Sequence, residues 1–180
     1  KALKMGLSQY PNDLALVLLK VDLLNSSQKF SESFSILKDI EHLFPNNIDI
    51  TIAIGKLASI LDFPLVAENY IDQAFSLSAL DNESKEILSD IAYEYLQLRL
   101  HNKAVNVMKE ILSRDPNNET TLLEIGVAFH ESNQLEESIT YFNYIINENP
   151  YSYLAWFNLG TVYNAKEMWN DAMFSFDMCL

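Results

Sequence analysis

The fold is decided by the last stretch of the chain, residues 150–180, which reads PYSYLAWFNLGTVYNAKEMWNDAMFSFDMCL. Its proline and its glycine both recur earlier in the chain at fixed distances. The prolines in phase are Pro11, Pro45, Pro116 and Pro150, separated by 34, 71 and 34 residues. The glycines in phase are Gly55, Gly126 and Gly160, separated by 71 and 34 residues. Both series contain the gap of 34 and the same gap of 71, which equals one repeat of 34 and one longer repeat of 37. Two residue types with different backbone roles therefore share one period, which predicts an array of repeats.

The side chains repeat in the same phase and predict two helices in each unit. The units, numbered from position 1, start at Leu14, Ile48, Lys85, Glu119 and Tyr153. Apolar or small residues recur at positions 4, 7, 8 and 11, and again at positions 20, 24 and 27, which are helical spacings. The phased proline cannot continue the second helix, and the pairs Asn46-Asn47 and Asn117-Asn118 that follow it are predicted to cap the next helix. Each unit is therefore a helix, a short turn, an antiparallel helix and a break.

This phase predicts the helix spans and their packing. The predicted helices cover residues 14–27, 30–44, 48–61, 64–80, 85–98, 102–114, 119–132, 135–148, 153–166 and 169–180. Residues 1–13 are expected to hold the end of an earlier second helix. The phased aromatic residues expected in the core are Tyr95, Phe129, Tyr163, Phe142, Phe176 and Trp156. Glycine or alanine at position 8 is expected to let two helices approach closely.

The last unit resembles the tetratricopeptide repeat, or TPR. Its residues Trp156, Leu159, Gly160, Tyr163, Ala172 and Phe176 match the pattern W-x2-L-G-x2-Y followed by A-x3-F. The resemblance extends over the whole chain and implies an all-α solenoid of antiparallel helix pairs wound as a right-handed superhelix. Residues 1–180 then form one array with a partial repeat 1–13, repeats 14–47, 48–84, 85–118 and 119–152, and a partial repeat 153–180. Since the chain starts within a repeat, we expect it to be a fragment of a longer protein.

Two units depart from the pattern. The first has Lys20 at position 7, where a buried leucine is typical. Either the register slips there or the lysine stem extends to solvent. The second unit is three residues longer around Leu80, Asp81 and Asn82, which predicts an extended helix end or a wider loop.

The charge of the chain disfavours some partners. It holds 12 basic and 25 acidic residues, a net charge of −13. From residue 115 onward, Lys166 is the single basic residue against ten acids. Binding of nucleic acid requires clustered lysine and arginine, so nucleic acid is not expected, and neither is membrane insertion, because no apolar run reaches the length of a span. The acids either keep a surface solvated or attract a partner with basic flanks. A cytoplasmic location is expected.

Residues typical of catalysis do not form a pattern. The three histidines, His42, His101 and His130, fall at positions 29, 17 and 12 of different repeats and cannot form a metal cluster. The only cysteine, Cys179, has no phased histidine and is interpreted as a packing residue. No glycine-rich phosphate loop is present in the sequence, since the phased glycines lie inside predicted helices. We therefore predict a protein that is not an enzyme and that needs no cofactor or metal.

The resemblance also implies a binding surface. In TPR proteins, positions 2, 5, 9, 12 and 13 of the first helices build a concave groove that takes extended or helical segments of other proteins. Carried over to this chain, those positions predict a groove that includes Ile52, Lys56, Ser89, Tyr93, Leu96, Leu123, Val127, His130, Phe157, Thr161 and Asn164. Lys56 is the only basic residue at positions 5 and 9, so a clamp for a C-terminal carboxylate is not expected.

The predicted function is a non-catalytic protein–protein interaction scaffold that binds a peptide or helical segment in this groove. Two alternatives remain open at this point. The chain could be a self-associating array, or it could be the recognition arm of a larger enzyme or signalling protein. Light scattering would test the first alternative, and the sequence of the parent protein would test the second.

Overall fold

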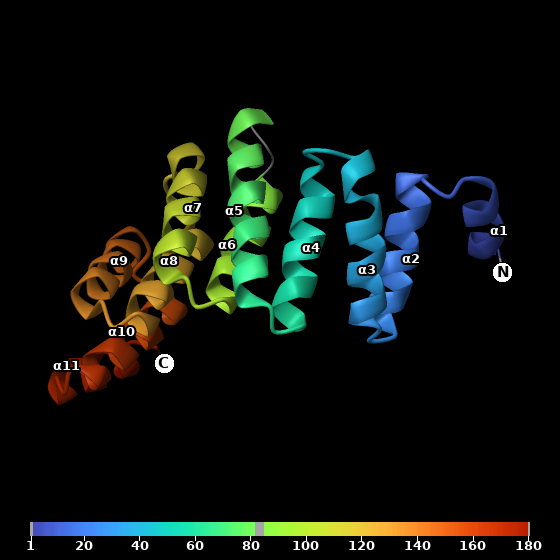
Figure 1. Ribbon diagram of the computed structural model, residues 1–180. Helices are drawn as coiled ribbons and strands as arrows, with labels where there is room; N and C mark the ends of the chain where they lie inside the picture. Colours follow the sequence, from blue (N-terminus) through green and yellow to red (C-terminus); the bar gives the residue numbers. More distant parts are fainter. Residues whose placement is uncertain (1, 82–84, 180) are drawn as a thin grey trace. The chain divides into compact units, whose positions relative to one another are not determined.

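The computed structural model describes residues 2–81 and 85–179. Within these ranges the chain forms eleven α-helices and one short 3-10 helix, and no β-strand (Figure 1). None of the described helices combines the length and the apolarity that crossing a membrane requires. The helices are α1 (Ala2–Gln9), α2 (Leu14–Ser26), α3 (Phe30–Ile40), η1 (Glu41–Leu43), α4 (Ile48–Ile60), α5 (Pro64–Asp81), α6 (Lys85–Gln97), α7 (His101–Arg114), α8 (Glu119–Glu131), α9 (Leu135–Glu148), α10 (Tyr153–Ala165) and α11 (Trp169–Asp177).

All ten predicted helices are confirmed, and each begins within one residue of its predicted start. Two ends differ from the prediction by more than one residue. The helix predicted to reach residue 44 ends as α3 at Ile40, and the chain tightens into the 3-10 turn η1, which is common at helix ends. The helix predicted to reach residue 180 ends as α11 at Asp177, and residue 180 lies outside the described residues. The longer second unit takes the form of an extended helix as far as Asp81, while Asn82 lies outside the described residues.

Side-chain caps start the first helix of four repeats. The side chains of Asp13, Asn47, Asn118 and Ser152 accept hydrogen bonds from the backbone N–H three residues later. The caps predicted at the asparagine pairs after Pro45 and Pro116 are confirmed, and the second asparagine of each pair, Asn47 and Asn118, is the one that caps. The four caps are separated by 34, 71 and 34 residues, the same distances as the phased prolines. The break between repeats thus ends one helix with a proline and starts the next with a polar side chain.

The turns inside the repeats also share one geometry. Each places a residue other than glycine in the left-handed region, at Gln28, Asp62, Arg99, Asn133 and Glu167. The next residue then donates its backbone N–H to a carbonyl of the preceding helix. For example, Leu100 donates to Tyr95 at 2.8 Å. These bonds satisfy carbonyl groups at the end of the first helix and reverse the chain into the second helix.

The chain divides into two compact units, residues 1–83 and residues 84–180. In the first unit, α2 packs against α3, α3 against α4, and α4 against α5. Its core includes Val21 and Leu37. Because α2 begins at Leu14 as predicted and Val21 at position 8 is buried, the helix keeps its register. Lys20 is half-buried on this helix.

The second unit repeats the same antiparallel order. Each helix from α6 to α11 packs against the next, and α8 also contacts α10 (Figure 1). The core cluster around α9 and α10 consists of Leu122, Phe142, Ile145, Ile146, Ala155, Leu159 and Val162. Of the aromatic residues predicted to be core, Tyr95, Phe129 and Phe142 are buried, while Trp156 and Tyr163 are half-buried. Phe176 was expected in the core and is instead 37% exposed, because α11 packs chiefly against α10.

At position 8 the first helix of a repeat lies directly against the side chain at position 24 of the second helix. A Cβ atom added to Gly126 would lie 2.6 Å from Cε1 of Phe142, and one added to Gly160 would lie 2.6 Å from Cε1 of Phe176. Gly55 has the same relation to Ile71. Since real Cβ atoms do not approach other atoms so closely, the side chain at position 24 occupies the space that a larger residue at position 8 would need.

The two aromatic contacts predict different responses to the same substitution. Gly126→Ala forces a methyl group against Phe142, which is fully buried, and we expect it to destabilise the chain by about 1–2 kcal/mol even after the gain in helix propensity. Gly160→Ala meets Phe176, which can turn toward solvent, so its cost is expected to be at least about 1 kcal/mol smaller. Urea unfolding followed by circular dichroism measures both values. Equal midpoints for the two variants would contradict this account.

A polar contact links the first helix of one repeat to the cap of the next. Glu119, at the start of α8, accepts a hydrogen bond from the Ser152 hydroxyl at 2.6 Å and another from the Asn149 side-chain amide at 3.0 Å. These two bonds hold the pKa of the Glu119 carboxyl below its ordinary value of 4.5. The ionised form of Glu119 therefore favours the folded state.

The contact at Glu119 predicts a pH dependence of stability. Its contribution is complete above about pH 4.5 and is lost as the pH falls through the lower pKa of the folded state. Glu119→Gln should be less stable than the parent at pH 7 by less than about 1 kcal/mol, because the group is partly exposed. That difference should shrink in acid. Urea unfolding across the acid range tests this, with Glu137→Gln on α9 as the control. A difference that does not change with pH would contradict the assignment.

Candidate interaction groove

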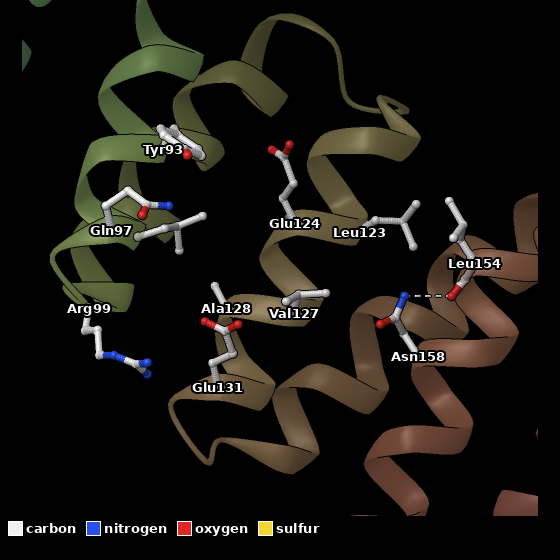
Figure 2. A pocket seen from close by; sticks show the side chains of 11 residues that line it. Tyr93, Gln97, Arg99, Leu123, Glu124, Val127, Ala128, Glu131, Leu154 and Asn158 are labelled. Atoms are coloured by element: carbon white, nitrogen blue, oxygen red, sulfur yellow. Dashed lines mark hydrogen bonds between the residues drawn. The ribbon is translucent and has the colours of Figure 1, made fainter. Parts of the chain in front are cut away.

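The first helices of three successive repeats line a groove in the second unit. The groove has a volume of about 450 Å³, and its residues come from α6, α8, α10 and the turn after α6 (Figure 2). The lining residues are Tyr93, Leu96, Gln97, Arg99, Leu123, Glu124, Val127, Ala128, Glu131, Leu154 and Asn158.

Helix periodicity explains why these residues face one side. On α8 the lining residues occupy positions 5, 6, 9, 10 and 13, and each has another member of the set three or four residues away, which places them on one face of the helix. The residues at positions 4, 7 and 8 of the same helix, Leu122, Ile125 and Gly126, are buried. Of the first stripe, Glu124 and Glu131 are exposed, Leu123 and Val127 are half-buried, and Ala128 is buried beneath the groove.

The structure brings four of the sequence-predicted groove residues together. Tyr93 and Leu96 on α6 and Leu123 and Val127 on α8 line the same groove. Tyr93 is 57% exposed, so its ring is available to a ligand.

The other predicted residues of the second unit do not line this groove. They are Ser89 on α6, His130 on α8, and Phe157, Thr161 and Asn164 on α10. Phe157 is 55% exposed, and its ring packs against that of Phe176 with centroids 5.8 Å apart.

The two predicted residues of the first unit lie on α4. Ile52 is buried, with 7% exposure, and its side chain contributes to packing. Lys56 is half-buried on the same helix.

Several lining residues were missed from the sequence. Gln97 and Glu131 occupy position 13, and Leu154 occupies position 2, so the groove positions implied by the resemblance could have found them. Glu124 and Asn158 occupy position 6, which those groove positions do not include. Position 6 lies four, three and seven residues from positions 2, 9 and 13, so helical spacing alone could have placed it on the same face as the groove. Arg99 was missed because it lies in the turn.

The groove is lined by more acidic than basic residues. Glu124 and Glu131 are acidic, and Arg99 is the basic residue among those that line it. Burial by its neighbours raises the pKa of the Glu124 carboxyl. Glu131 Oε2 lies 3.7 Å from Nδ1 of His101.

The polar groups of the groove suit binding rather than catalysis. The side-chain amide of Asn158 donates to the Leu154 carbonyl at 2.8 Å, so this donor is already engaged within α10 (Figure 2). Among residues 2–81 and 85–179, no group of three or more His, Cys, Asp or Glu is placed to hold a metal ion. The arrangement offers apolar contact area with a few polar groups, which is typical of a recognition surface.

Solved structures with the same fold are TPR proteins. YrrB, described as a TPR protein with an unusual peptide-binding site, matches with a TM-score of 0.71 and 14% identity, over 99% of this chain and 91% of its own. MamA from Desulfovibrio magneticus RS-1 matches with a TM-score of 0.69 and 16% identity, over 92% of both chains. These identities show the fold alone. No curated protein matches the chain by sequence.

A family model matches a large part of the sequence. The family is described as ChAPs (Chs5p-Arf1p-binding proteins), and the match extends over residues 57–180. This range begins within α4, so it covers part of the last helix pair of the first unit. It also covers the whole of the described second unit, including the groove. Because the match covers well over half of the chain, this TPR-fold protein belongs to the ChAPs family.

Proposed function

We propose that this protein-interaction scaffold binds its partner by holding an extended or helical protein segment in the groove of α6, α8 and α10. The observation that carries the proposal is the apolar lining there, with the exposed Tyr93 on one helix and the half-buried Leu123 and Val127 on the next. Exposed aromatic and aliphatic residues in a concave site are the usual anchors of protein recognition. TPR and ChAPs proteins are typically non-catalytic scaffolds.

The family description supports a protein as the partner. Members are described as binding Chs5p and Arf1p, and we take a partner of the Chs5p or Arf1p kind as the first candidate for this chain. A binding segment with basic flanks suits the ten acidic residues against one lysine from residue 115 onward. The cytoplasmic location stays a prediction.

Self-association is the second candidate function. The observation that favours it is the exposed apolar surface of α11, where Trp169 is 58%, Met173 65% and Phe174 59% exposed. A second copy could cover this surface. Light scattering over a range of concentrations separates the two candidates, because a scaffold that binds only other proteins stays monomeric.

The groove assignment is tested with two tyrosine variants. Tyr93→Ala should weaken binding of a Chs5p-type or Arf1p-type partner about tenfold or more, because it removes an exposed aromatic anchor. Tyr151→Ala is the matched control, since this tyrosine is 92% exposed and does not line the groove. Isothermal titration calorimetry with each purified partner measures the affinities.

Two results would contradict the assignment. If Tyr93→Ala binds both partners as the parent does, the groove is not the binding surface. If Tyr151→Ala and Tyr93→Ala weaken binding equally, the loss does not depend on the groove. Circular dichroism of each variant checks that the helices are retained.

A further inference from the structure

One acidic side chain of the groove, Glu124, is exposed and has no partner among the described residues. Glu124 projects from α8, and Figure 2 shows its carboxylate between Tyr93 and Leu123. No residue within the ranges 2–81 and 85–179 forms a hydrogen bond or an ion pair with it. Burial by the surrounding groove residues is the cause of its raised pKa.

Three other acids of the second unit have partners within the fold. Glu119 accepts hydrogen bonds from Ser152 and Asn149, Glu136 pairs with Lys166, and Asp115 pairs with Lys85. A carboxylate that loses part of its water without gaining a donor is held at a cost in free energy. A ligand that brings a donor to Glu124 would offset this cost, so the free chain already contains an acceptor that is suited to a partner.

We infer that Glu124 receives the side chain of a lysine or an arginine from the protein segment that occupies the groove. The ammonium or guanidinium group donates to the carboxylate. The aliphatic stem of the same side chain lies over Leu123 and Val127, which offer apolar surface. The open ring of Tyr93 provides a face on which the cation is further stabilised.

Charge in the groove favours this occupant over an acidic or neutral segment. The lining holds two acids, Glu124 and Glu131, against Arg99. Arg99 follows the end of α6. Glu124 projects from α8 near Tyr93 in the view of Figure 2. The net negative charge of the lining therefore favours a cationic residue of the partner, and Glu124 is its acceptor.

The inference rests on the proposed function and is tested with random peptides displayed on phage. Residues 1–180, Glu124→Gln and the control Glu137→Gln are each used to select binders. The parent and the control should both enrich peptides that carry lysine or arginine at one fixed place between apolar residues. Glu124→Gln should retain the apolar preference and show a weaker preference for the cation, because glutamine keeps the shape of the side chain but not its charge.

A double-mutant cycle measures the pair directly. One lysine-containing peptide selected by the parent is compared with the same peptide carrying norleucine in place of the lysine. For the parent, the change should weaken binding about five- to tenfold, the range of a partly exposed charge pair. For Glu124→Gln, the difference between the two peptides should be clearly smaller, because the charge pair is gone while the contact with the Tyr93 ring remains. A norleucine effect of the same size in both proteins would overturn the inference.

The outcomes separate this inference from the proposed function. Binding that is lost in Tyr93→Ala but unchanged in Glu124→Gln contradicts the cation subsite and leaves the groove as the binding surface. Binding that is unchanged in both variants contradicts the groove and the subsite together. A selection that enriches no peptide also contradicts both.

Discussion

The close approach of the two helices in each repeat is the constraint on which the rest of the structure depends. At Gly126 there is no room for a side chain, because the ring of Phe142 fills the space. The hydroxyl of Ser138 on the second helix donates to the Gly126 carbonyl at 2.7 Å, so the contact includes a buried hydrogen bond. A small residue at position 8 and another at position 20 thus fix the distance between the helices, and a large residue at position 24 fills what remains.

This pairing determines which surface is left for function. Once positions 4, 7 and 8 of α8 are buried against the second helix, the stripe that includes Leu123, Glu124 and Val127 must face away from it. Because α6, α8 and α10 occupy equivalent places in successive repeats, their open stripes contribute to one groove. The chemistry of the groove is then set by residues that the packing does not constrain, and in this chain those residues are apolar and acidic.

Much of the helical framework could be predicted from the sequence, because each break carries its own local signals. Asn47 and Asn118 identified helix starts through capping, and the phased prolines identified helix ends. Tyr93, Leu96, Leu123 and Val127 were found from the position of the groove in related repeats.

Local signals do not exist for the remaining features. The early end of α3 at Ile40 and the exposure of Phe176 depend on what packs against each helix. The missing partner of Glu124 depends on the side chains that neighbouring helices bring to the groove.

The central claim is that the open stripe of the first helices binds protein. NMR chemical shifts of leucine and valine methyl groups test this most directly, because leucine and valine occur on both the first and the second helices of the repeats. On addition of a selected peptide, the account predicts that the largest changes occur at Leu96, Leu123, Val127 and Leu154, which line the groove. Val107 and Leu112 on α7 and Leu135 on α9 should change little. If the largest changes instead occur at methyl groups of the second helices and the groove methyl groups do not change, the account is contradicted.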